Sequence, residues 1–192
     1  MISKDRKINN DSSHIKDVLR KHIREMEDPG WLHCLDSNLN LPSEWDTAEY
    51  RVLFVFMSTA ESRSVSSTDN VLNNLVKTKY GNRVFVDMCY LPAKGDLPLY
   101  EKYQLPVMIG AVAQRSAWDY DVIMFSNSTV EEKINLPWLV HHTGMPVWHT
   151  ERMNPENEKV PLLLLGGNSS DMSEVFLGVR YRDWEKIGRA HV

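Results

Sequence analysis

Small polar residues follow three apolar runs of this chain, and they are the residues best suited to bind a ligand. Hydroxyl and amide groups both donate and accept hydrogen bonds, and glycines let the backbone approach a bound molecule closely. No pairing of a nucleophile with a base, and no set of metal ligands, accompanies them. We therefore predict a binding site without catalytic residues, formed by Ser58, Thr59, Glu61, Arg63, Ser126, Asn127, Ser128, Gly166, Gly167 and Asn168.

The three apolar runs must position these residues. They cover 51–56, 121–125 and 161–165, and they are short and apolar on both faces. Such runs are typical of parallel strands buried between two helical layers. Because α/β sheets bind ligands at the carboxyl ends of their strands, we expect the polar stretches to lie along one edge of the sheet.

The helices expected to cover the sheet are marked by apolar residues at helical spacing and by capping residues. The first is capped within 10–13, has an apolar stripe from Ile15 to Met26, and ends at Pro29-Gly30. The helix from Asn135 has Pro137 in its first turn and ends at Gly144. Others are expected at 67–81, burying Val71, Leu72, Leu75 and Val76, as one turn at 99–103, and from Asp171 to Phe176.

Further strands are expected at 83–87, 106–109 and 145–148. Strands that alternate with helices predict an α/β fold with three layers and a mainly parallel sheet. We divide the chain into a helical N-terminal extension, 1–45, and an α/β domain, 46–185.

The composition narrows the classes of function. A net charge of −4 argues against a nucleic-acid binder, whose surface is usually basic. The N-terminus is polar and no apolar run is long enough to span a membrane, so neither a secretory signal nor a membrane segment is expected. Cys34 and Cys89 are far apart and form no CxxC motif, which argues against structural zinc and favours a cytoplasmic setting.

Two other groups of titratable residues have simpler interpretations. His141 and His142 are neighbours on a predicted helix, where their side chains point about 100° apart and cannot easily share one ion. Glu131 and Glu132 are expected to be solvated or to cap the following turn. We assign neither pair to the site.

An ordered set of short motifs carries a family resemblance. They are Asn82–Phe85, Leu105–Val107, Trp118–Ile123, Phe125-Ser126 with Asn135, Gly144–Val147, and the leucine-rich strand before Gly166-Gly167. In this order the chain from Trp45 to about Gly178 resembles the N-terminal cobalamin-binding domain of B12-type radical SAM proteins. The resemblance implies a Rossmann-like, flavodoxin-type fold that holds the corrin ring over the carboxyl edge of the sheet, with Ser126, Gly166 and Gly167 facing the cofactor.

The first loop departs from one pattern of cobalamin domains. Where such domains carry an Asp-x-His-x-x-Gly motif, whose imidazole binds cobalt, this chain has 57–64 without histidine or glycine. We therefore expect cobalamin to bind without a histidine ligand from this loop. Arg63 remains a candidate contact to a phosphate or a corrin side chain.

The resemblance also implies a second domain, which would carry the radical chemistry. Radical SAM chemistry needs three cysteines to hold a 4Fe-4S cluster that binds S-adenosylmethionine, and Cys34 and Cys89 cannot provide them. We expect a downstream radical SAM domain as the partner of this fragment, which alone would catalyse nothing. Residues 187–192 resemble a translated sequencing adapter, with Lys186 at the junction, so 186–192 is expected to be a tail outside the fold; a natural basic tail is the alternative.

Two alternatives stay open. Flavodoxins hold the FMN phosphate in a Ser/Thr-rich loop after the first strand, and the loop from Ser58 to Ser64 has the hydroxyls but no glycine. A flavin- or phosphate-binding domain is therefore the second candidate. A non-catalytic interaction domain is the third, and an open apolar cleft between the edge loops would argue against it.

Overall fold

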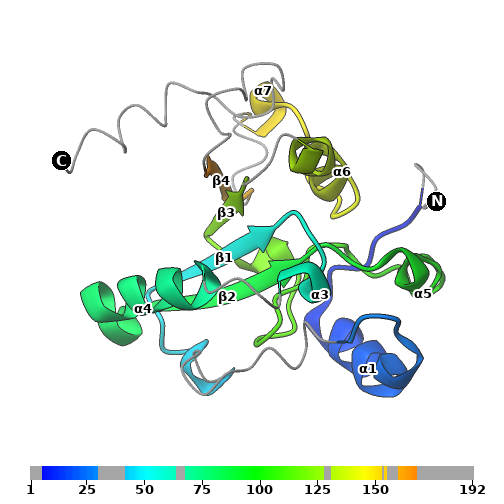
Figure 1. Ribbon diagram of the computed structural model, residues 1–192, viewed down its shortest axis with the longest axis horizontal. Coiled ribbons are helices and arrows are strands. Elements are labelled where there is room, and N and C mark those ends of the chain that lie inside the picture. The colour runs from blue at the N-terminus through cyan, green and yellow to red at the C-terminus, as the bar shows by residue number, and fades with distance from the viewer. Residues whose placement is uncertain are drawn as a thin grey trace.

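A four-stranded parallel sheet forms the centre of the molecule. The computed structural model describes residues 6–29, 42–63, 68–127, 131–152, 154 and 160–167. Its strands are β1 (Tyr50–Phe56), β2 (Val84–Tyr90), β3 (Val122–Ser126) and β4 (Leu162–Gly166), in the spatial order β2-β1-β3-β4. Every neighbouring pair is parallel (Figure 1). The α/β class and the parallel sheet predicted from the sequence are confirmed.

Short helices surround this sheet. They are α1 (Ser12–His22), α3 (Ala60–Arg63), α4 (Thr68–Tyr80), α5 (Leu97–Lys102), α6 (Asn135–His141) and α7 (His149–Arg152). Single 3-10 turns lie at Ile23–Glu25, Pro42–Glu44, Gly81–Arg83, Lys94–Asp96, Ala117–Asp119 and Glu131–Ile134. None of the helices in the described ranges is long and apolar enough to cross a membrane. The helix expected at 171–176 and the tail at 186–192 lie outside the described residues.

The inner strand β1 is covered on both faces. Its last residues, Leu53 to Phe56, alternate between the two faces of the sheet, and all of them are buried. A strand with one solvated face would alternate between buried and exposed residues, as β4 does, where Leu163 and Leu165 are buried but Leu162 is 54% exposed. Layers on both sides of β1 fit the predicted three-layer arrangement.

Two of the predicted strands are wrong. Residues 106–109 are buried but form a loop, with one antiparallel bridge between Ile109 and Ser116. The backbone N–H groups of Val107 and Met108 donate to the carbonyl of His142 and to Thr143 Oγ1, so no strand partner remains for them.

Residues 145–148 also form no strand. The N–H of Met145 donates a hydrogen bond to the carbonyl of Val140, near the end of α6. The guanidinium of Arg152 donates hydrogen bonds to the carbonyls of Pro146 and Val147, at 2.9 and 2.6 Å. Apolar character predicted a strand here, whereas a neighbouring helix end and one arginine satisfy the backbone instead.

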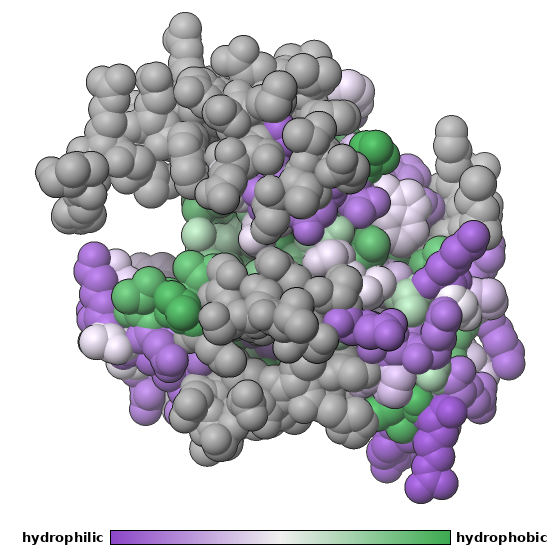
Figure 2. All heavy atoms as spheres, in the orientation of Figure 1, coloured by the Kyte–Doolittle hydropathy of each residue, from purple (hydrophilic) through white to green (hydrophobic). Residues whose placement is uncertain are grey.

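Helix α4 packs with a different face than its sequence suggests. Leu72 and Val76 lie against the core and Asn73 is buried, whereas Val71 and Leu75 are 52% and 61% exposed. Residues 72, 73 and 76 form the face of the helix that contacts the core. Residues 71 and 75 are one turn apart and lie on a different face of the helix. The predicted burial of Val71 and Leu75 is wrong, and apolar residues gather on the surface over α4 (Figure 2).

The N-terminal extension belongs to the same hydrophobic core. Asp11 caps α1 by accepting a hydrogen bond from the N–H of Ser13 at 2.7 Å, and the apolar stripe of α1 is buried. The α-helix ends at His22, earlier than Pro29-Gly30. Arg6 then ties the segment down by donating to the carbonyls of Tyr100, Leu105 and His142.

Asp87 organises the long connection between β2 and β3. This fully buried carboxylate accepts hydrogen bonds from the N–H groups of Val112 and Ala113, both at 2.9 Å, and from the Tyr120 hydroxyl at 2.7 Å. Burial raises the pKa of Asp87, and these hydrogen bonds oppose that rise. Gly110 packs against the same group so closely that a Cβ there would overlap Tyr120 and Asp87.

We predict that Asp87→Ala lowers the free energy of unfolding by about 3 kcal/mol or more, because it leaves several buried donors without an acceptor. Tyr120→Phe removes one donor and keeps the acceptor, so its cost is expected to be about 1–2 kcal/mol. Urea unfolding followed by circular dichroism measures both. Equal stability of Asp87→Ala and the native chain would contradict this role.

We also predict a loss of stability in acid through His142. Burial, reinforced by His141 and Arg6, lowers the pKa of this ring to about 4. Its stabilising contribution is complete above the unfolded pKa of about 6.5 and is lost as the pH falls toward 4, by about 1–2 kcal/mol at pH 5. His142→Phe keeps a ring beside Trp138 but cannot titrate, so its unfolding free energy should change less between pH 7 and pH 5.

Candidate functional site

The strand register brings the three predicted polar stretches to one edge. Phe56 of β1 pairs with Ser126 of β3, which in turn pairs with Gly166 of β4. Ser58, Asn127 and Gly167 follow these residues directly or after one further position. The described members of the three stretches are therefore neighbours at the carboxyl edge. Ser128, Asn168 and the side chain of Arg63 lie outside the described part of the chain.

The loop after β1 is held from two sides. The carbonyl of Ser58 accepts a hydrogen bond from the N–H of Leu91 at 3.0 Å, which links it to the loop after β2. The carbonyl of Met57 accepts one from Asn135 Nδ2, also at 3.0 Å. Asn135 is the first residue of α6, so its side chain joins the start of that helix to the first loop.

Within this loop the predicted residues have different surroundings. The Ser58 hydroxyl is buried and has no hydrogen-bond partner in the described structure. Thr59 is half-buried and Glu61 is exposed. The N–H of Glu61 donates to Asp28 Oδ2 at 3.3 Å, so the N-terminal segment contacts α3 beside the edge. Ser58 is the member best placed to meet a buried ligand.

Asn127 is the most unusual of the predicted residues. Its backbone N–H donates to the carbonyl of Gly166 at 2.7 Å, which extends the pairing of β3 with β4 by one bond. Its side chain is fully buried, yet neither Oδ1 nor Nδ2 has a hydrogen-bond partner in the described structure. Native proteins leave very few buried amides unsatisfied, because burial removes their hydrogen bonds to water.

Gly167 has a structural reason to be glycine. Its φ is +115°, a conformation that L-residues rarely adopt, and a Cβ there would overlap the backbone of Asn127. The space beside Gly167 is therefore occupied by the loop after β3. Gly166 and Gly167 bring the two loops into contact.

Lys133 belongs to the same corner and was missed from the sequence. It lies in the turn Glu131–Ile134, two residues before Asn135, and is 4% exposed. Its Nζ has no hydrogen-bond partner among the described residues. In the sequence, a lysine beside two glutamates suggests a solvated turn. Only the burial of Lys133 in the structure marks it as a candidate site residue. Buried lysines are almost always paired, because an uncompensated charge away from water is costly.

The donors at this edge suit an oxygen-rich ligand. A serine hydroxyl, an amide N–H₂ and an ammonium group can each donate to an anionic or carbonyl oxygen, and the Asn127 carbonyl can accept in return. The described residues contain no cluster of three His, Cys, Asp or Glu side chains that could hold a metal ion. The arrangement is suited to binding a polar molecule.

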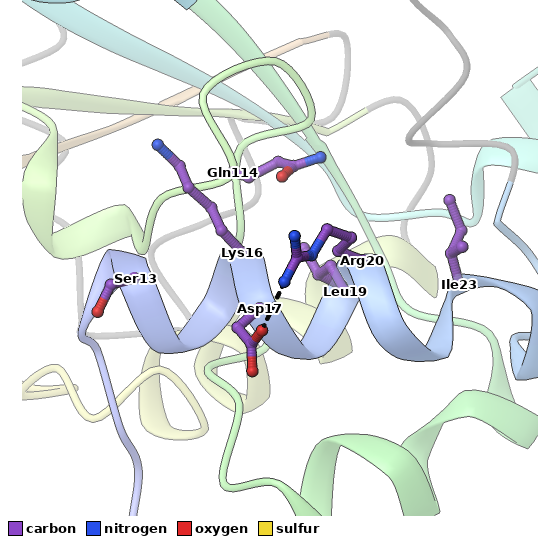
Figure 3. Close-up of a pocket in the computed structure, with 7 residues that line it drawn as sticks. All are labelled: Ser13, Lys16, Asp17, Leu19, Arg20, Ile23 and Gln114. Carbon is purple, nitrogen blue, oxygen red and sulfur yellow. Dashed lines mark hydrogen bonds and ion pairs between the residues drawn. The ribbon is translucent and has the colours of Figure 1, made fainter.

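Two surface hollows lined by described residues lie elsewhere. One, of about 560 Å³, lies between α1 and Gln114, with Lys16 and Arg20 reaching over it (Figure 3). Asp17 turns away from Gln114 and pairs with Arg20 at 3.2 Å. The other, of about 530 Å³, is lined by residues that include Arg6, His141 and Glu151. Neither contains any of the predicted site residues.

Comparisons with known proteins identify no relative: no family model, no curated protein and no solved structure matches this chain.

We predict that Gly167→Ala strongly destabilises the protein, because a methyl group must displace the backbone of Asn127. Gly81→Ala is the matched control: Gly81 also has a positive φ, +60°, but nothing lies within 4 Å of its Cβ position. The control should lower the free energy of unfolding only by the cost of holding alanine at a positive φ, about 1–2 kcal/mol. Denaturant unfolding compares the two variants, and equal losses would show that the contact with Asn127 contributes nothing.

Proposed function

We propose that this chain is the cobalamin-binding domain of a radical SAM enzyme and binds the corrin at the carboxyl edge of its sheet. The observation that carries the proposal is the set of buried, unpartnered polar atoms on Ser58 and Asn127. They lie at the edge where α/β sheets bind ligands. The strand order β2-β1-β3-β4 supports a flavodoxin-type fold, whose order begins in the same way.

Several residues of this chain would hold the cofactor. Ser58 and Asn127 have free hydrogen-bonding capacity for the amide groups that surround a corrin ring. Ser126 and Gly166 end the two strands next to them. The described start of the first loop, Met57 to Ala60, offers no imidazole, so the proposal involves no histidine from this loop. When bound, cobalamin supplies cobalt chemistry such as methyl transfer.

The proposal assigns the radical reaction to another domain. A 4Fe-4S cluster that binds S-adenosylmethionine needs three cysteines, and the sequence has two. Cys89 is free and buried, and burial raises the pKa of its thiol to about 12, which suits a structural thiol. A radical SAM domain would therefore be the partner of this one, in the cytoplasm.

A flavin or another phosphate-bearing molecule is the second candidate ligand. Lys133 is compatible with it, because a buried ammonium group without a partner in the described structure calls for an anion, and the phosphate of FMN could supply one, as could the phosphate in the nucleotide tail of cobalamin. This candidate uses the same edge of the sheet and differs only in the ligand.

We predict that hydroxocobalamin titrated into the purified 192-residue chain shifts the corrin absorption bands and raises the melting temperature of the protein. FMN, followed by quenching of its fluorescence, is the parallel titration. No spectral change with hydroxocobalamin at high micromolar concentration would contradict the cobalamin proposal. Quenching of FMN in the same protein would support the second candidate instead.

A further inference from the structure

The turn before α6 is inverted in polarity. Lys133 is 4% exposed, whereas its neighbour Ile134 is 69% exposed. Hydrophobic burial alone would favour the opposite arrangement, with isoleucine inside and lysine in water. The fold therefore places an ammonium group inside at the expense of an apolar side chain.

No group in the described structure compensates this lysine. Its Nζ is buried without a hydrogen-bond partner, and it forms no ion pair with a described carboxylate. A lysine with a purely structural role would normally donate to carbonyls, as Arg6 does to three of them. Its unused donors indicate an acceptor that is not part of the described chain.

The position of Lys133 links it to the carboxyl edge. Asn135, two residues later, donates to the carbonyl of Met57, immediately before Ser58. Ser58 in turn follows β1, and Asn127 follows its register partner β3. The three side chains with unsatisfied donors thus come from two connections that leave the carboxyl edge: Ser58 follows β1, and Asn127 and Lys133 lie between β3 and α6.

We propose that Lys133, Ser58 and Asn127 form a subsite for the phosphate group of the bound cofactor. This inference rests on the proposed function, in that it takes the carboxyl edge as the cofactor site. Phosphate oxygens accept several hydrogen bonds at once, and lysine provides the opposite charge. The nucleotide tail of cobalamin and the ribityl phosphate of FMN both carry this group, so the two candidate ligands share it.

Ligand pairs that differ in the phosphate distinguish these sources. Cobinamide phosphate is compared with cobinamide, which lacks that phosphate, and FMN is compared with riboflavin. In the native chain the phosphate-bearing member of one pair should bind more tightly. The pair that shows this difference identifies the ligand. Equal affinities within both pairs would overturn the subsite.

Lys133→Met tests the residue itself. Methionine keeps the approximate length of the side chain but removes the charge and the donors, so binding of the phosphate-bearing ligand should weaken about 10- to 100-fold. Binding of its phosphate-free counterpart should change less than about twofold, because that ligand makes no charged contact to lose. Without ligand, the variant should melt at a higher temperature than the native chain, because an uncompensated buried charge is gone. A structural lysine would give the opposite shift.

Lys94→Met is the matched control. Lys94 is exposed and lies in the loop after β2, at the same edge of the sheet, so it undergoes the same change of charge without burial. It should alter neither melting temperature nor affinity. Equal weakening by both variants would show a general effect of charge and overturn the role of Lys133.

Inorganic phosphate separates this inference from the proposed function. It should raise the melting temperature of the native chain and not that of Lys133→Met. If phosphate does so while neither cobalamin nor FMN binds, the subsite is supported and the proposed function fails. If a cofactor binds the native chain and Lys133→Met equally well, the subsite is overturned and the proposed function stands.

Discussion

The register of the parallel sheet is the constraint on which the rest of the structure depends. Phe56 pairs with both Tyr90 and Ser126, and Ser126 pairs with Gly166, so four strands end at one level. Parallel strands cannot be joined by tight turns, and each loop at that level begins a crossover. Main-chain hydrogen bonds therefore fix which loops become neighbours. The side chains of those loops need only be compatible with the resulting contacts, as Gly167 is with Asn127.

A second constraint acts on the connection from β2 to β3. Residues 105–120 run through the interior with little regular structure, although a buried backbone must still satisfy its polar groups. Asp87 supplies acceptors for two of the N–H groups, and Thr143 and the carbonyl of His142 supply others. Side chains and helix ends thus replace a sheet ladder. This explains how an apolar segment can be buried without becoming a strand.

The carboxyl edge differs from the rest of the interior in how its polar groups are satisfied. Asp87, Thr143 and Ser116 all have partners within the chain. Asn127 and Lys133 are equally deep and have none in the described structure. The fold satisfies its buried polar groups in one region and leaves them unsatisfied in another. A ligand bound in the second region would supply the missing hydrogen-bond partners. The proposed cofactor site takes its physical basis from this contrast.

The sequence by itself determined the elements with strong local signals. The runs at 51–56, 121–125 and 161–165 are strands to within one residue, and Asp11 caps α1 and Gly81 follows the end of α4 as their types predict. Helix α6, in contrast, ends at His141, before the predicted Gly144. Only the tertiary structure decided what each element contacts. Val71 and Leu75 have the same spacing as a buried stripe, yet the contact falls on Leu72 and Val76. Lys133 looks like a surface residue, yet it is buried in the turn before α6, whose first residue contacts the loop after β1. Local patterns record which residues can be buried, whereas burial itself depends on contacts between segments far apart in the chain.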